Sequence, residues 1–150
     1  MKTMLRPMLQ GLCLTLVAAA VTPVLAQSQA RMVGPEHLSA HWIMLNTKVD
    51  ADIPNSGRNL DKPVCAAVSY EIGSDGVPRD VQLRKVAPDS DLGQVAVSIV
   101  KNLRYGPSLT NRGSEPIATY YVVPFNTTTM DPAQKAKLVA ACQLPGYAQD

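Results

Sequence analysis

Residues 64–125 constrain the fold more than any other part of the chain, because they read as strand, turn, strand, helix and strand. Apolar residues alternate with smaller or polar ones over residues 64–72, which is typical of a strand with two different faces. Residues 73–76 (Gly-Ser-Asp-Gly) predict a tight turn, since Asp-Gly accepts positive φ angles. Val81 and Leu83 alternate with polar residues on the return strand. This part of the chain therefore predicts an antiparallel hairpin.

A helix and a third strand are expected after the hairpin. Asp89, Ser90 and Asp91 offer oxygens that suit a helix N-terminus. The apolar residues that follow have the spacing of one buried helical face: Leu92, Val95, Ala96, Ile99 and Leu103. The alternation of Val95, Val97 and Ile99 leaves a strand as the alternative. Residues 117–125 alternate as a strand, and Pro124, which cannot donate a ladder hydrogen bond, predicts a sheet edge or an unpaired strand end.

Two more helices are expected around this core of residues 64–125. Leu38, Trp42 and Leu45 have helical spacing within residues 35–46. Asp131 as a cap and Pro132 at the first position predict a C-terminal helix over residues 132–142. The predicted fold class is α+β, in one domain over residues 35–150. Its small three-stranded antiparallel sheet consists of a β-hairpin and an edge strand joined by a helix, and it packs with an N-terminal and a C-terminal helix.

The first 26 residues have the features of a signal peptide. Lys2 and Arg6 precede an apolar stretch, and Val24-Leu25-Ala26 is a small-residue cleavage pattern. The alternative is that the uncharged residues 8–26 are retained as a membrane anchor. Residues 27–34 make up a short polar segment, which is expected to be a disordered leader. Export would place the domain in the periplasm.

Charge and aromatic content argue against a nucleic-acid partner. The chain has 14 Lys and Arg against 12 Asp and Glu, and removal of Lys2 and Arg6 leaves 12 of each sign. A formally neutral domain lacks the positive surface that phosphate binding needs. One Trp, five Tyr and one Phe also offer little for base stacking.

Two cysteines, Cys65 and Cys142, remain after signal cleavage. An even number of cysteines in an exported protein predicts a disulfide, with two buried thiols as the alternative. The bridge would tie the C-terminal helix to the first strand of the hairpin.

Residues that commonly carry catalysis or bind metals form no convincing set. His37 and His41 are four apart on the predicted helix, but no third ligand belongs to them, and surface histidines are the simpler interpretation. Asp75 and Asp80 flank a turn, where aspartate usually serves backbone geometry. No nucleophile elbow, phosphate-binding loop or dinucleotide motif occurs. We therefore expect no catalytic residue, no metal and no cofactor, and the chain is predicted not to be an enzyme.

The third strand is the remaining candidate for function. An edge strand offers backbone donors and acceptors that an extended peptide can join by β-augmentation. The alternative is an edge protected by Pro124 and the C-terminal helix.

Several short segments, in this order and spacing, resemble the TonB C-terminal domain family. The segments are AAVSYEI at residues 66–72, DGV at 75–77, VQL at 81–83, LRYGP at 103–107, residues 113–116 and YVVPF at 121–125. The resemblance covers about 60 residues, roughly half of the exported chain. It implies a small periplasmic α+β domain with a three-stranded antiparallel sheet and no catalytic residues.

The resemblance also implies how such a domain binds its partner. An envelope protein, or a segment of an outer-membrane receptor, would add a strand to the third strand. The peptide-binding residues would be Thr119, Tyr120, Tyr121, Val122, Val123 and Pro124. The alternative function is a short, membrane-anchored energy transducer for outer-membrane transport, with residues 8–26 retained. Membrane contact is expected only in that case, and a homodimer is an alternative assembly.

Overall fold

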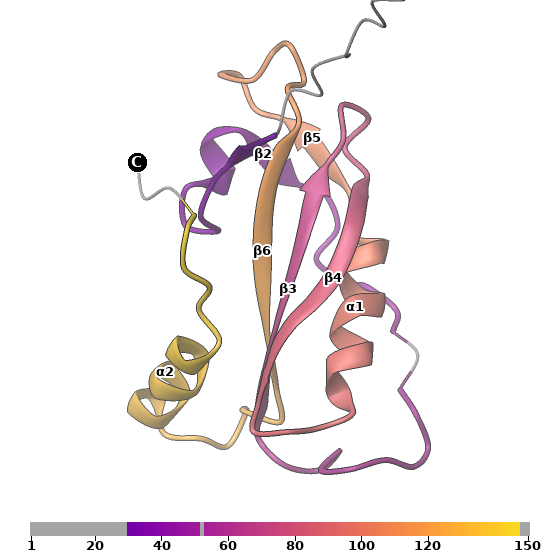
Figure 1. The fold of residues 1–150 in the computed structure, drawn as a ribbon, viewed down its shortest axis with the longest axis vertical. Coiled ribbons are helices and arrows are strands. Elements are labelled where there is room, and N and C mark those ends of the chain that lie inside the picture. The colour runs from indigo at the N-terminus through magenta and orange to yellow at the C-terminus, as the bar shows by residue number, and fades with distance from the viewer. Residues whose placement is uncertain (1–29, 52, 148–150) are drawn as a thin grey trace, which may run out of the picture.

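Figure 1 shows the fold in a computed structural model, which describes residues 30–51 and 53–147. The elements in chain order are β1 (Arg31–Met32), the 3₁₀ helix η1 (Leu38–Ala40), β2 (Trp42–Met44), β3 (Val64–Ile72), β4 (Pro78–Ala87), α1 (Leu92–Asn102), β5 (Tyr105–Pro107), β6 (Ile117–Phe125) and α2 (Pro132–Ala141). Within these described ranges, no helix combines the length and apolar character needed to cross a membrane. The predicted signal peptide lies outside them.

The main sheet has four strands in the order β1-β6-β3-β4, while β2 and β5 form a separate two-stranded sheet. β3 pairs antiparallel with both β4 and β6. β1 pairs parallel with β6 at two positions, Arg31 with Ile117 and Met32 with Ala118. The mixed α+β class and the antiparallel β4-β3-β6 unit are confirmed. The prediction of a sheet of three strands is wrong, because β1 adds a fourth strand and β2 and β5 add a second sheet.

The predicted turn between β3 and β4 is confirmed. The N–H of Gly76 donates to the Gly73 carbonyl at 2.8 Å, and the N–H of Val77 donates to Asp75 Oδ1 at 3.2 Å. Gly76 has a φ of +75°, and a side chain there would collide with the Tyr105 carbonyl. The Tyr105 N–H donates to the Gly76 carbonyl at 2.9 Å. This glycine therefore allows β5 to meet the hairpin turn.

The helical interpretation of the segment after the hairpin is also confirmed, and α1 covers one face of the sheet (Figure 1). Its buried residues are Leu92, Gly93, Val95, Ala96 and Val100. Ser90, rather than a neighbouring aspartate side chain, accepts the Leu92 N–H at 3.1 Å. A Cβ on Gly93 would lie 2.7 Å from Val86 Cγ2 of β4, so glycine permits the close packing of helix on sheet.

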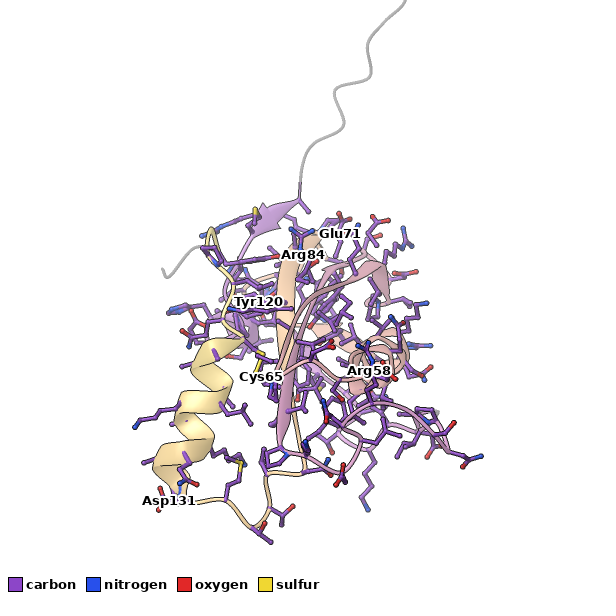
Figure 2. The ribbon with its side chains drawn as sticks, turned by 60° about the horizontal axis from the view of Figure 1, so that its bottom comes forward. Arg58, Cys65, Glu71, Arg84, Tyr120 and Asp131 are labelled. Carbon is purple, nitrogen blue, oxygen red and sulfur yellow. A yellow bond between two sulfur atoms is a disulfide. The ribbon has the colours of Figure 1, made fainter. Side chains whose placement is uncertain are left out.

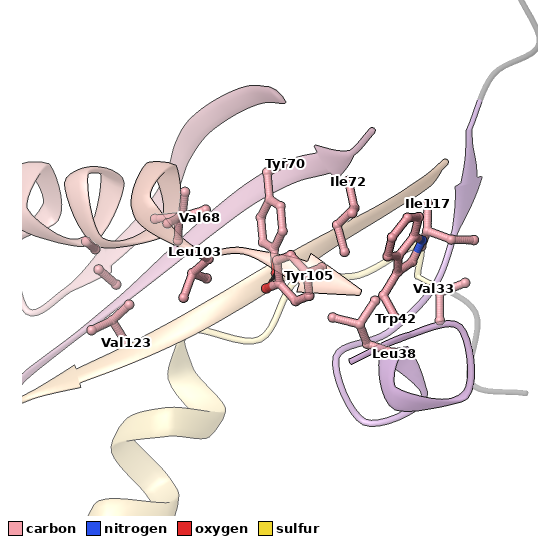
Figure 3. Packing of buried hydrophobic residues seen from close by; sticks show 13 residues of the cluster. Val33, Leu38, Trp42, Val68, Tyr70, Ile72, Leu103, Tyr105, Ile117 and Val123 are labelled. Atoms are coloured by element: carbon pink, nitrogen blue, oxygen red, sulfur yellow. Dashed lines mark hydrogen bonds between the residues drawn. The ribbon is translucent and has the colours of Figure 1, made fainter. Parts of the chain in front are cut away.

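The main core lies on the α1 side of the sheet. Alternate residues of β3 (Ala66, Val68, Tyr70 and Ile72) pack there with Ala96 and Val100 of α1 and with Trp42. Figure 3 shows the Trp42 end of this core, where its ring stands close to Val33, Leu38 and Ile117. The Trp42 Nε1–H donates to the Glu115 carbonyl at 3.1 Å, so the buried indole has no unpaired donor.

The opposite face of the sheet is covered by α2 and the segment after it. The predicted disulfide is confirmed: Cys65 of β3 and Cys142 at the end of α2 are joined with an S–S distance of 2.01 Å. Figure 2 shows the bridge at the end of α2 opposite Asp131, whose side chain caps the helix as predicted. Asp131 Oδ1 accepts the Ala133 N–H at 2.8 Å. No residue of α2 itself is buried, so the bridge is its main attachment.

The prediction of a helix over residues 35–46 is wrong. The segment forms the single turn η1 and then β2, which pairs antiparallel with β5. Leu38 and Trp42 are buried as the spacing suggested, but Leu45 is 67% exposed. Trp42 pairs with Pro107 and donates to the Glu115 carbonyl, and both partners are far away in the sequence. These long-range contacts outweigh the local helical pattern.

The prediction of a disordered leader over residues 27–34 is wrong for its described part. Residues 31–32 form β1, and Val33 is only 2% exposed. The Val33 N–H donates to the Ala118 carbonyl at 2.9 Å. Because a buried side chain and backbone pairing hold this segment, the ordered domain begins before residue 35.

Candidate functional site

The free edge of β6 begins where β1 ends. β1 accompanies β6 only at Ile117 and Ala118. In the part of the chain that the structure describes, no strand lies beside residues 119–125 on the side away from β3. The edge-strand prediction is therefore corrected: β6 lies between β1 and β3 at its start and, among the described residues, is a free edge beyond Ala118.

The direction of each backbone group along this edge follows from the pairing of Ala118. Its carbonyl accepts from Val33 and so points away from β3. Backbone groups of a strand point to alternate sides, so Tyr120, Val122 and Pro124 also present theirs to the free edge. Pro124 lacks an N–H at a position where β3 needs none, which explains why a proline is tolerated here.

The six predicted peptide-binding residues thus divide into two sets. Thr119, Tyr121 and Val123 direct their backbone groups toward β3. Thr119 is 0% exposed, and no partner is found for its buried Oγ1 among the described atoms. Tyr120 and Val122 each present a donor and an acceptor to the free edge, and Pro124 presents an acceptor. These three residues are the ones that an added strand would meet.

A polar pocket of about 490 Å³ lies beside Tyr120. Its lining residues come from the segment after β1, from β6 and from the segment after α2: Glu36, His37, Tyr120, Gln143 and Leu144. Tyr120 is held in place on the α2 side by Tyr147, with ring centroids 4.8 Å apart, and by the neighbouring disulfide. Burial raises the pKa of Tyr147, which keeps its hydroxyl neutral at ordinary pH.

An apolar pocket of about 230 Å³ lies beside Tyr121, on the α1 side. It is lined by Pro35, Leu38, Ser39, Trp42, Ile43, Met44, Tyr105 and Tyr121. Tyr105 is fixed in this wall because its hydroxyl lies 2.5 Å from that of Tyr70 in the core (Figure 3). Burial raises the pKa of Tyr105 to about 12 and that of Tyr70 well above its usual value, so both remain neutral.

The two histidines are not brought together as metal ligands. His37 and His41 are the residues that flank η1 at its two ends, not neighbours on one face of an α-helix. Within the described residues, no group of three or more His, Cys, Asp or Glu side chains is placed to hold a metal ion. His37 instead lines the polar pocket.

The two aspartates near the hairpin turn have backbone roles. Asp75 accepts from the Arg79 guanidinium at 2.8 Å, and this bond lowers the pKa of its carboxyl. Asp80 has a φ of 50°, a conformation that aspartate tolerates better than most residues. Asp75 therefore has the turn role that was predicted, whereas Asp80 lies within β4, opposite the register shift between Ser69 and Glu71.

Sequence reasoning missed most of the residues around the edge. Ile43, Met44, Gln143 and Leu144 come from segments far from β6 in the sequence. The only local sequence signal for these pocket residues was the polar pair Glu36-His37 between apolar neighbours, and this pattern is typical of a turn as well as of a helix.

Comparisons with known proteins leave the family unassigned. No family model matches the chain, and no curated protein matches its sequence. One solved structure that it is similar to is described as "Solution NMR structure of Pseudomonas aeruginosa TonB CTD". The sequences are 14% identical, the match covers 68% of this chain and 100% of that chain, and the TM-score is 0.46. Membership of the TonB C-terminal domain family stays a prediction from the sequence resemblance.

Proposed function

We propose that this chain is a non-catalytic protein-binding domain of the bacterial periplasm, which captures an extended segment of an envelope protein by adding it as a strand to β6. The observation that carries the proposal is the free edge over residues 119–125, which starts immediately after the two residues covered by β1. Outer-membrane receptors are the partner class that the sequence resemblance favours.

Backbone hydrogen bonds would supply the affinity. A strand beside the edge can accept from the N–H groups of Tyr120 and Val122 and donate to the carbonyls of Tyr120, Val122 and Pro124. Each such bond contributes about 0.5–1.5 kcal/mol after exchange with water. Because these bonds involve only main-chain atoms, they hold a partner without selecting its sequence.

β4, the strand at the opposite end of the main sheet, is poorly suited to accepting an added strand. Its exposed residues are largely charged: Arg79, Asp80, Arg84 and Lys85. The pairing of β4 with β3 is also shifted at two places, between Ala67 and Val68 and between Ser69 and Glu71. Charges and bulges of this kind protect an edge from further pairing. The edge of β6 has neither feature.

An extended segment fits the surroundings of the β6 edge better than a second copy of the domain does. The polar pocket beside Tyr120 has its walls in residues 36–37 and residues 143–144. We therefore expect a single strand to fit between these walls, whereas a second domain would bring its own flanking elements against them.

The proposal of a periplasmic location is supported by the disulfide and by the predicted signal peptide. The Cys65–Cys142 bridge is the kind of bond that persists in an oxidising compartment and is rare in the cytosol.

Backbone NMR of the exported protein tests the proposal. The probe is a set of synthetic peptides that cover extended periplasmic segments of outer-membrane receptors. Binding is expected to shift the amide signals of Tyr120 and Val122 most. Val122→Pro removes one edge donor and is expected to weaken binding about five-fold relative to Val122→Ala, which keeps the donor. Shifts centred on β4, or equal affinities for the two variants, would contradict strand addition at β6.

A further inference from the structure

The two pockets beside Tyr120 and Tyr121 flank the same part of the free edge. We propose that they select two consecutive residues of the bound segment: an apolar side chain in the pocket beside Tyr121 and a basic side chain in the pocket beside Tyr120. This inference rests on the proposed strand addition and adds the sequence preference that main-chain bonds cannot supply.

The alternation of side chains places the pockets on opposite faces of one strand position. Tyr120 packs on the α2 side of the sheet and Tyr121 on the α1 side. A strand added beside them alternates in the same way, so two neighbouring side chains of the partner point to opposite faces. Each of the two would therefore enter a different pocket.

The segment that follows β1 contributes to both pockets. Pro35 and Leu38 line the apolar pocket, whereas Glu36 and His37 line the polar one. Only residues 33 and 34 separate this segment from β1, and β1 covers the edge of β6 as far as Ala118. Both pockets therefore lie near the place where the free edge starts, beside the first residues that an added strand would pair with.

The apolar pocket has the size and walls for one side chain. Its volume of about 230 Å³ is below the roughly 300–1,000 Å³ of small-molecule sites. Trp42 is 1% exposed and bonded to the Glu115 carbonyl, and Tyr105 is bonded to Tyr70, so two of its walls are fixed. Ile43, which is 52% exposed, adds apolar surface at the rim. A Leu, Ile, Met or Phe side chain suits this pocket.

The polar pocket favours a basic side chain because of Glu36. Among its five lining residues, Glu36 is the one that carries a formal charge at pH 7 when histidine is counted as neutral. Its side chain is exposed and lies next to Gly34, where an added Cβ would collide with the carboxylate. Gln143, also exposed, can accept a hydrogen bond from the same ligand through its amide oxygen. Lys or Arg satisfies both groups.

A random heptapeptide library displayed on phage, selected on the exported protein, tests the inference. The enriched peptides are expected to carry Leu, Ile, Met or Phe next to Lys or Arg. The most enriched peptide is then synthesised and titrated. Glu36→Lys is expected to weaken its binding about five-fold, an effect that salt reduces, and to change the selected basic residue to Asp or Glu. Ile43→Glu is expected to weaken binding about ten-fold by placing a charge at the apolar rim.

Matched controls use exposed residues that line neither pocket. Asp61→Lys makes the same charge change as Glu36→Lys, and Ile53→Glu replaces an isoleucine that is 69% exposed. Neither is expected to change the affinity. The side-chain preference would be overturned, and strand addition at β6 kept, by either of two results. The selected peptides could shift the Tyr120 and Val122 amides but show no apolar-basic pair, or they could bind both pocket variants as tightly as the wild type. Failure to select any peptide that binds this edge would overturn strand addition as well.

Discussion

Removal of the Cys65–Cys142 disulfide is expected to release α2 from the sheet while the sheet stays folded. The bridge joins residues 77 positions apart, for which the chain-entropy model gives about 4.5 kcal/mol of stabilisation as an upper value. Little else holds the helix, because α2 has no buried residue and only Leu138 and Val139 are half-buried. Its 10 residues are also fewer than the roughly 12–15 that an isolated helix needs in water.

Native-state hydrogen exchange of the double variant Cys65→Ala/Cys142→Ala measures this effect residue by residue. The amides of Leu138 and Val139 are expected to lose their protection, whereas those of β3 and β6 should keep theirs at a reduced overall stability. Asp131→Ala is the control, because it keeps the bridge and removes only the helix cap, at a cost of about 1 kcal/mol to the helix. The reasoning is refuted if α2 stays protected in the double variant.

Two further predictions concern the packing of α1 and the hairpin turn. Gly93→Ala is expected to cost about 1–3 kcal/mol in urea unfolding, because its Cβ would lie 2.7 Å from Val86 Cγ2; unchanged stability would mean that α1 can shift freely. The pKa of Asp75 is lowered from 3.8 by the hydrogen bond from Arg79. The ionised carboxylate therefore stabilises the folded state above pH 3.8, and this stabilisation is lost as pH falls through the folded pKa. Asp75→Asn should therefore lose less stability than the wild type on acidification below that pH, as urea unfolding at a series of pH values would measure; equal losses would contradict this role of Asp75.

The β3-β4-α1-β6 core was predictable because its signals are local. Period-2 alternation on β3 and β6, the turn that contains Gly76, and the helical spacing after Ser90 each specify their own element. β3 and β4 then pair as consecutive strands, as strands joined by a short turn commonly do, whereas β6 returns past α1 to pair with β3. The bridge was predictable from the number of cysteines together with the predicted signal peptide.

The elements before residue 50 were not predictable because distant partners determine them. Leu38, Trp42 and Leu45 match a helix, but the pairing of Trp42 with Pro107 and its bond to the Glu115 carbonyl make the segment a strand. Two-residue β1 has no periodicity to detect, and it forms because Val33 is buried beside the start of β6.

The candidate site was predictable as a stretch of β6 but not in its details. Pro124 and the alternation of residues 117–125 pointed to an edge. The pairing of β6 with β3 and β1 determines which of its backbone groups face outward, and no local sequence pattern predicts that pairing. The apolar pocket brings Ile43 to Tyr121, and the polar pocket brings Leu144 to Tyr120, so only the folded structure reveals them.

β1 gives the proposed strand addition a fixed starting point. Sheets with a long uniform edge allow a partner to slide by two residues at little cost, because the same faces are restored. Here Met32 already pairs with Ala118, so an incoming strand meets the chain's own β1 at that position. A short partner segment must stop there, and a longer one must compete with β1 for residues 117–118. The length of the bound segment would thus measure how firmly the start of the domain holds its place in the sheet.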